Sequence, residues 1–244
     1  MRLALVHGFT QTGRSWAPIA SRLRANGHEV VTPDAPGHGA KATVEADLWR
    51  GADLLADEVG RAIWIGYSMG GRLCLHLALR HPDLVEGLVV VSTTAGIDDP
   101  QQRAARRRAD DSRAATIAQE GVPAFIQSWL SAPMWATLRE EDRGVDERLT
   151  NTAEGLASSL RHAGTGTQEP LWDRLHEIKA PVLVVSGELD ATFTAAGDRA
   201  GRQIGARATR QTLAGVGHAV PWEAPAAFVE AVETWLETTT ASQE

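Results

Sequence analysis

The sequence predicts an α/β fold with a doubly wound, mostly parallel sheet and a helical cap insertion. Short aliphatic runs that end in Gly, Pro or Asp recur along the chain, and amphipathic stretches of helical length lie between them. The strand pattern stops between Thr93 and about Lys179 and then resumes. Strands that alternate with helices are typical of a parallel sheet covered on both faces.

Six short runs have the aliphatic character of buried strands, at residues 3–6, 29–32, 62–65, 88–91, 181–186 and 207–213. Helices are expected at residues 16–26, 69–80 and 224–237. Between the fourth and fifth strands the chain is rich in Ala, Arg, Glu and Leu, and it carries Trp129, Trp135 and Trp172. We therefore expect a core formed by residues 1–93 and 180–244 and a helical cap formed by residues 94–179.

Composition and charge exclude several classes of protein. The 244 residues are 43% hydrophobic and 23% charged, as in ordinary globular proteins. The formal net charge of −7 argues against a nucleic-acid partner, because phosphate binding depends on Lys and Arg. The first apolar run, residues 3–6, is one strand long, so we expect neither a signal peptide nor a membrane span.

Cys74 is the only cysteine, so no internal disulfide can form and we expect a cytoplasmic protein. It lies on an apolar helical stretch, which favours a core residue over a nucleophile. The sequence has no cluster of His, Cys and Asp with metal-ligand spacing and no phosphate-binding glycine loop. We therefore expect no metal and no organic cofactor, while the sequence leaves the oligomeric state open.

Residues 66–70 form a Gly-x-Ser-x-Gly motif directly after a predicted strand and directly before a predicted helix. In that context the motif is typical of a nucleophile elbow, a tight turn that exposes a strained serine. Side chains at Gly66 and Gly70 would clash in such a turn. Ser68 is therefore the candidate nucleophile, and a glycine-rich turn with an incidental serine is the less favoured alternative.

A serine hydroxyl is a poor nucleophile or base near neutral pH, so it needs an imidazole, which in turn needs an acid to fix its tautomer. Asp190 follows a late predicted strand, and His218 follows the last one in a glycine-rich loop. The order Ser68, Asp190, His218 is the order that accompanies this elbow. Glu188 competes for the acidic role, but Asp190 lies farther along the loop, where the imidazole is expected.

His7-Gly8-Phe9 follows the first predicted strand, where a donor to a developing oxyanion is expected. We expect the backbone N–H groups of Phe9 and Met69 to form the oxyanion hole. The alternative is that His7-Gly8 is only a turn that ends the strand. Residues 34–39 form a similar turn, which we interpret as structural.

These motifs resemble the α/β-hydrolase superfamily over nearly the whole chain: His7-Gly8-Phe9, Asp34-x-Pro36-Gly37-His38-Gly39, the elbow, Gly187-Glu188-x-Asp190 and Gly217-His218. Within it, the chain is similar to the 2-succinyl-6-hydroxy-2,4-cyclohexadiene-1-carboxylate synthase family of menaquinone biosynthesis. The narrower similarity rests on residues 66–72, 106–110, Trp129 with Pro133, Arg148, and 164–168 leading to Leu171-Trp172. It implies a lyase, in which the histidine-activated serine abstracts a proton and pyruvate is eliminated without an acyl-enzyme.

The resemblance also implies a small anionic substrate with several carboxylates, bound by Arg72, Arg148 and Arg106. Arginine suits this role because its planar donors bind a carboxylate bidentately. Arg106 lies in the arginine-rich run of residues 103–108, which could instead be a solvated helix face.

Two aromatic residues, Tyr67 and Trp129, are candidate pocket residues, although Tyr67 could equally serve in packing. Leu130 departs from the family pattern, which has an aromatic residue with a polar group after Trp129. One substrate hydrogen bond is therefore in doubt, and Trp135 occupies a nearby aromatic position.

Other functions remain open on the same residues. A carboxylesterase or thioesterase would use the same three residues for acyl transfer and would need no arginine cluster. A hydrolase that cleaves carbon–carbon bonds of ring-cleavage products is a second alternative, because fold alone does not separate these activities. A non-catalytic ligand-binding protein on this fold would be expected to have lost part of the Ser-His-Asp set, which is complete here.

Overall fold

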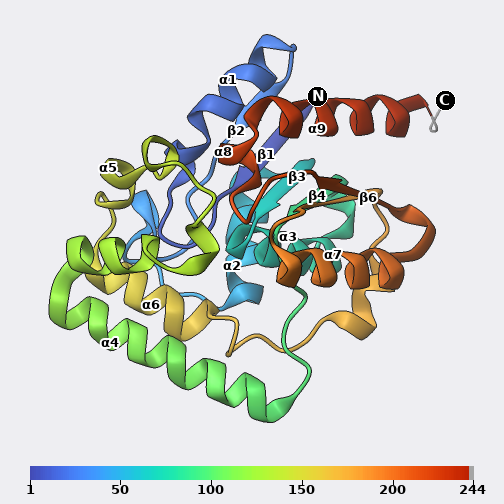
Figure 1. Ribbon diagram of the computed structural model, residues 1–244. Helices are drawn as coiled ribbons and strands as arrows, with labels where there is room; N and C mark the ends of the chain where they lie inside the picture. The colour runs from blue at the N-terminus through green and yellow to red at the C-terminus, as the bar shows by residue number, and fades with distance from the viewer. Residues whose placement is uncertain (242–244) are drawn as a thin grey trace.

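Six strands of the computed structural model form one parallel sheet in the order β2-β1-β3-β4-β5-β6 (Figure 1). The structure describes residues 1–241. The strands are β1 (Arg2–Val6), β2 (Glu29–Val31), β3 (Ala62–Tyr67), β4 (Val85–Val91), β5 (Val182–Gly187) and β6 (Ala208–Leu213). The predicted α/β fold with a mostly parallel sheet is confirmed.

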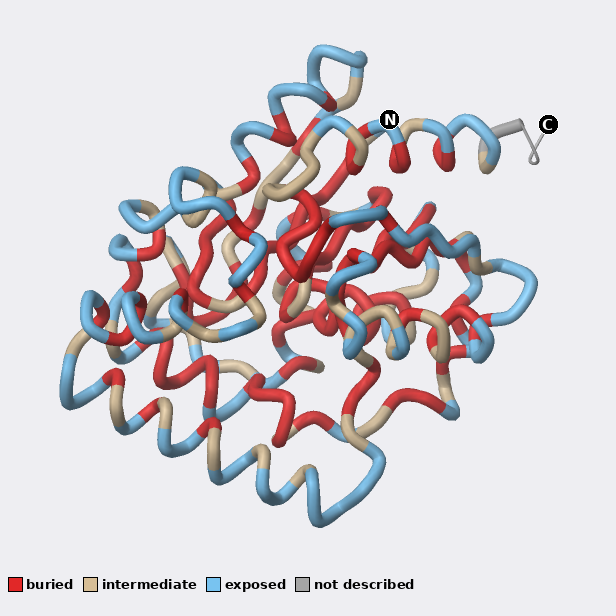
Figure 2. Tube along the Cα trace, in the orientation of Figure 1, coloured by how far each residue is buried: buried red, intermediate tan, exposed pale blue. Residues whose placement is uncertain are grey.

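Helices cover both faces of the sheet. One apolar layer joins the sheet to α1 (Ala17–Ala25) and α9 (Pro225–Ala241). The other joins it to α2 (Leu48–Val59), α3 (Met69–Arg80) and α7 (Ala191–Ile204). Successive β3 side chains alternate between the layers, because side chains of a strand point to opposite faces. The central strands are accordingly buried (Figure 2).

The predicted elements agree with the observed ones apart from their ends. Strand β4 begins at Val85 rather than at residue 88. Glu86, which is exposed, and Gly87, which has no side chain, interrupt the aliphatic pattern at its start. Helices α2 and α7 were not singled out from the sequence. The remaining short elements are α8 (Val220–Glu223) and the 3-10 helices Gly13–Trp16, Gly39–Lys41, Pro82–Leu84, Pro133–Trp135, Glu140–Asp142, Trp172–Glu177 and Gly205–Arg207.

The segment between β4 and β5 contains helices and, within residues 1–241, no strand. Its helices are α4 (Pro100–Leu130), α5 (Val145–Arg148) and α6 (Ala153–Ala163). Helices α4 and α6 lie side by side over one end of the sheet and share an apolar cluster of their own (Figure 1). We call this segment the cap; the core-and-cap division stays a prediction. No helix in the described chain combines the length and apolar character that a membrane crossing requires.

The parallel sheet places its candidate functional residues together. All six strands point the same way, so the loops after β1, β3, β4, β5 and β6 leave the same edge of the sheet. That edge is where ligands bind in open α/β sheets. Phe9, Ser68, Asp190 and His218 all follow strands at this edge, beneath the cap.

Candidate active site

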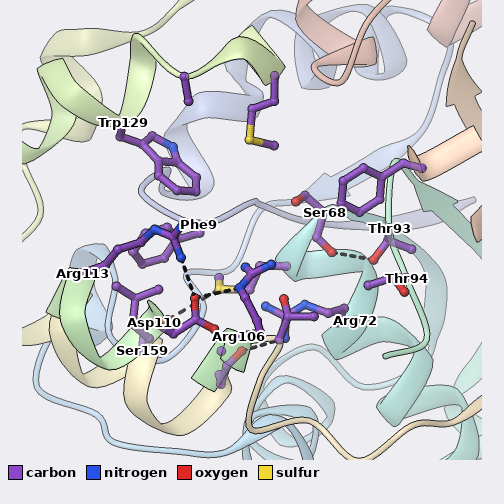
Figure 3. A pocket seen from close by; sticks show the side chains of 18 of the residues that line it. Phe9, Ser68, Arg72, Thr93, Thr94, Arg106, Asp110, Arg113, Trp129 and Ser159 are labelled. Carbon is purple, nitrogen blue, oxygen red and sulfur yellow. Dashed lines mark hydrogen bonds and ion pairs between the residues drawn. The ribbon is translucent and has the colours of Figure 1, made fainter. Parts of the chain in front are cut away.

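Ser68 lies at the turn between β3 and α3 in a strained backbone conformation. Its φ of 51° and ψ of −109° fall in a region that non-glycine residues rarely adopt. A Cβ at Gly66 would lie 2.4 Å from the carbonyl oxygen of Gly70, and a Cβ at Gly70 would lie 2.1 Å from that of Val6. The two glycines are therefore required by close backbone approach. Thr93 supports the turn, because its hydroxyl donates to the carbonyl oxygen of Ser68 (2.7 Å; Figure 3).

Ser68, His218 and Asp190 form a hydrogen-bonded row. His218 Nδ1 lies 2.6 Å from Asp190 Oδ2, and His218 Nε2 lies 3.3 Å from Ser68 Oγ. Asp190 caps α7, and its other oxygen accepts from the Phe193 N–H (3.2 Å). The imidazole is 1% exposed. A carboxylate on Nδ1 leaves Nε2 free to accept a proton from the serine, which is the arrangement for general-base activation.

Glu188, the alternative acid, lies elsewhere on the same loop. Its Oε2 accepts from the Gly215 N–H at 2.8 Å, whereas Asp190 bonds directly to His218. The geometry therefore favours Asp190.

Phe9 and Met69 both line the cavity beside Ser68. Neither backbone N–H has a hydrogen-bond acceptor within the described chain, so both are available to an oxyanion. The loop that carries Phe9 is fixed through Thr10, whose φ of 70° is also strained. The N–H of Thr10 donates to His38 Nε2 (3.3 Å), and its carbonyl accepts from Asn151 (2.8 Å).

Two buried histidines support this loop in their neutral form. His7 Nε2 accepts from the Ala35 N–H, and His38 Nε2 accepts from the Thr10 N–H, so neither nitrogen can carry a proton. Burial lowers the pKa of His7 to about 4, and burial together with His7 lowers the pKa of His38 to about 3.

Acidification from pH 7.5 to 5 is expected to lower the free energy of unfolding by about 2 kcal/mol for each of His7 and His38. Below pH 6.5 the unfolded chain takes up protons on these imidazoles while the folded chain does not, so stability decreases as pH falls. Urea unfolding at the two pH values measures the change. Equal stabilities would contradict neutral burial, and His38→Gln should remove about half of the difference.

A cavity of about 740 Å³ extends from Ser68 under the cap. Phe9, Phe125, Trp129 and Trp135 form an aromatic wall, with the Phe9 and Trp129 ring centroids 5.4 Å apart. Three buried donors near this wall, Tyr67 Oη and the indole nitrogens Trp129 Nε1 and Trp135 Nε1, have no partner within the described chain. The cavity therefore offers an apolar wall to a ligand, while these three donors are covered by neighbouring atoms.

Leu130, the departure noted in the sequence, is buried in the apolar cluster of the cap and does not line the cavity. Trp135 does line it, but its indole N–H is buried and has no hydrogen-bond partner within the described chain.

The end of the cavity away from Ser68 carries three arginines and one carboxylate (Figure 3). Asp110 Oδ1 pairs with Arg106 Nε (2.9 Å) and Arg113 Nη1 (3.1 Å). Arg72 donates through Nη1 to the carbonyl of Ala163 (2.7 Å), and burial with the nearby Arg106 lowers its pKa only to about 10. Three cations thus face one anion, which leaves this end of the cavity positively charged.

Arg148 does not line the cavity. Its Nη1 donates to the Thr10 hydroxyl and to the Phe9 carbonyl (3.5 Å), and its Nε donates to the Arg143 carbonyl (2.8 Å). It is 3% exposed, and burial lowers its pKa to about 10, so it remains a cation. The expected direct contact with a substrate carboxylate is therefore not supported. Arg148 instead fixes the loop that presents the Phe9 amide, because its side chain points toward Thr10 behind the cavity wall.

Sequence reasoning missed Arg113, Asp110 and Thr93 as cavity residues. Arg106, Asp110 and Arg113 are spaced i, i+4 and i+7, which places them on one face of a helix. That spacing was readable in the sequence, whereas nothing local placed Thr93 against the Ser68 carbonyl. Cys74 is buried, as expected for a core residue, and burial raises the pKa of its thiol.

Comparison with known proteins supports the resemblance. The chain is 28% identical over 243 residues to the 2-succinyl-6-hydroxy-2,4-cyclohexadiene-1-carboxylate synthase of Pectobacterium atrosepticum, covering 96% of this chain and 93% of that protein. It is 32% identical over 245 residues to a Bacillus subtilis (strain 168) protein that carries the same synthase name provisionally, covering 95% and 88%. It also matches Protein PHYLLO, chloroplastic, of Arabidopsis thaliana at 27% identity over 259 residues, but spans only 15% of that protein.

The structure of MenH from S. aureus superposes on this chain with a TM-score of 0.92 at 27% identity, covering 98% of this chain and 94% of that one. Residues 3–231 match the pattern of the alpha/beta hydrolase family. The match spans the sheet, the elbow and the cap, as the resemblance predicted. The chain therefore belongs to the alpha/beta hydrolase family.

Proposed function

We propose that this enzyme eliminates pyruvate from a polycarboxylate cyclohexene intermediate of menaquinone biosynthesis, as 2-succinyl-6-hydroxy-2,4-cyclohexadiene-1-carboxylate synthases do. One observation supports this most: Arg72, Arg106 and Arg113 line one end of a cavity with Asp110 as the single carboxylate among them, and the other end holds Ser68. An acyl-transfer enzyme for neutral esters has no need of that charge. The names of the bacterial relatives point to the same reaction.

In the proposed mechanism, Ser68, Asp190 and His218 act as a base. His218 withdraws the serine proton, and Ser68 Oγ takes a proton from a ring carbon beside a carboxylate or carbonyl group. The C–H electron pair forms a new double bond as the bond from the ring to the enolpyruvyl oxygen breaks, and the enolate that leaves takes up the proton held by His218 and tautomerises to pyruvate. The Phe9 and Met69 amides stabilise the negative charge that develops on the substrate oxygen. Arg72 and Arg106 hold substrate carboxylates, and Arg113 adds a third cation.

The deciding experiment compares two substrates on the purified enzyme. Pyruvate release from the cyclohexene intermediate tests the lyase, and p-nitrophenol release from a short ester tests the hydrolase. We expect kcat/KM to be far higher for the intermediate. Ester hydrolysis without pyruvate release would leave an esterase as the better assignment.

A hydrolase is the second candidate, because the Ser68–His218–Asp190 row with two free amides also suits acyl transfer. A carbon–carbon bond hydrolase would use the same three residues. If the purified protein turned over neither substrate, a non-catalytic binding protein would be the better assignment. A cytoplasmic location is part of the proposal, since a single buried cysteine suits a reducing compartment.

Arg72→Ala is expected to lower kcat/KM for the cyclohexene intermediate about 10- to 100-fold while leaving the neutral ester nearly unchanged, because a charge-assisted bond to a carboxylate is lost. Arg148→Ala serves as the contrast and should slow both substrates alike, since it disturbs the Phe9 loop. Kinetics on both substrates measure the difference. Equal losses for Arg72→Ala would contradict its role in carboxylate binding.

EDTA is expected to leave turnover unchanged. Among residues 1–241, no group of three or more His, Cys, Asp and Glu side chains could hold a metal ion. The rate is measured after dialysis against EDTA, with and without added divalent ions. Recovery of a lost rate upon adding a divalent ion would contradict the expectation.

A further inference from the structure

The loop that carries His218 has little regular structure to hold it. Residues 214–219 lie between β6 and the single turn of α8 and belong to neither a helix nor a strand. The loop contains Gly215 and Gly217, and glycine restrains the backbone least. The ring of His218, however, must remain within hydrogen-bond reach of both Ser68 and Asp190. Something outside regular structure therefore has to fix this backbone.

The carboxylate of Glu223 binds the backbone on both sides of His218. Its Oε2 accepts from the Gly217 N–H, and its Oε1 accepts from the Ala219 N–H, each at 2.8 Å. The N–H of Glu223 donates back to the Ala219 carbonyl at 2.9 Å, which closes a reciprocal ring of bonds. Hydrogen bonds to an ionised carboxylate are stronger than those between neutral groups.

Packing leaves these two amides few other partners. Ala219 is 1% exposed and Gly217 is buried. A Cβ on Gly217 would lie 2.1 Å from the hydroxyl of Thr137 and 3.2 Å from both Glu223 oxygens. The two amides thus lie in a closely packed part of the loop, where an unsatisfied buried N–H is unfavourable.

We propose that Glu223 is a positioning residue, which fixes the backbone of His218 so that its imidazole stays aligned between Ser68 and Asp190. Asp190 orients the ring from its Nδ1 side, whereas Glu223 acts on the main chain and does not contact the reacting atoms. The proposal rests on the catalytic role of the three residues but not on the choice of substrate. It holds for the lyase and for the hydrolase.

The same loop provides a matched control. Glu188 also binds a loop amide through its carboxylate, but it bonds to Gly215, three residues before His218, and it is exposed. Glu188→Gln and Glu223→Gln thus each remove one carboxylate charge that accepts from an amide of the His218 loop. Only Glu223→Gln turns an amide N–H toward one of the two donors that flank the histidine.

Glu223→Gln is expected to lower kcat about 10- to 100-fold with KM within about threefold of wild type, because a displaced general base slows chemistry rather than binding. Glu188→Gln should leave both constants near wild type. Proton NMR provides a readout that needs no turnover: the low-field signal of the His218 Nδ1 proton, shared with Asp190, should broaden or vanish in Glu223→Gln and persist in Glu188→Gln.

A kcat for Glu223→Gln within about twofold of wild type would overturn the proposal, and so would equal losses in both variants, which would indicate general loop stability. If Glu223→Gln does not fold, Glu223→Asp replaces it. Its shorter carboxylate cannot reach both amides, so full activity would overturn the proposal. An active Ser68→Ala enzyme would instead defeat the catalytic assignment, which keeps the two failures distinguishable.

Discussion

Ser68→Ala is expected to lower kcat at least about a thousandfold on any substrate the enzyme accepts, because removal of a nucleophile or base of this kind leaves only binding and the oxyanion donors. Ser68 Oγ is the one group that contacts His218 Nε2 in the row of hydrogen bonds. Steady-state kinetics with the cyclohexene intermediate and the p-nitrophenyl ester measure the loss. A variant that retains more than about a tenth of wild-type turnover would exclude the assignment.

Two measurements separate lost chemistry from lost structure in that experiment. Ser21→Ala, on the exposed side of α1, is the control and should keep wild-type kinetics. The unfolding midpoint of Ser68→Ala should match wild type, since alanine tolerates the strained φ no better than serine. Ser68→Gly should be more stable than Ser68→Ala, because glycine adopts that φ without strain.

Asp190→Asn is expected to lower kcat roughly a thousandfold or more with little change in unfolding midpoint. The Asp190 carboxylate accepts from His218 Nδ1 at 2.6 Å, which keeps the proton on Nδ1 and leaves Nε2 as the acceptor. An asparagine N–H directed at Nδ1 would favour the other tautomer, with Nε2 protonated and unable to act as a base.

Glu188→Gln tests the acid assignment in parallel with Asp190→Asn. The Glu188 carboxylate bonds to a loop amide and not to the imidazole, so its kinetics should remain near wild type. If Glu188→Gln were the slow variant and Asp190→Asn the active one, the two acids would have to exchange roles.

The elbow and the order of its partners were predictable because their signals are local. A Gly-x-Ser-x-Gly sequence between an aliphatic run and an amphipathic helix constrains a turn of a few residues. A parallel sheet then brings the ends of distant strands to one edge, so Asp190 and His218 could be expected near Ser68 without knowledge of any long-range contact.

The cap was less predictable because its residues take their roles from packing between helices. Arg72 lies on the helix after the elbow and Arg106 on the cap, and both line the cavity. Arg148 was expected beside them, but it lies behind the Phe9 loop. Whether Arg148 lies on the cavity side of that loop or behind it depends on how α5 packs against the loop. No local sequence pattern encodes that packing. Glu223 was likewise not recognised, because its partners are backbone amides.

Arg148 and Asn151 belong to the cap, yet their side chains bond to Thr10, the neighbour of Phe9, and Gly39 in turn donates to Asn151 (3.0 Å). The cap is thus not an interchangeable module. A chimera that exchanged residues 94–179 between two relatives would lose the Arg148 and Asn151 bonds to Thr10 wherever the new cap lacks those side chains, unless residues 8–12 were transplanted with it. Redesign of substrate specificity in this fold therefore has to exchange the cap and residues 8–12 together.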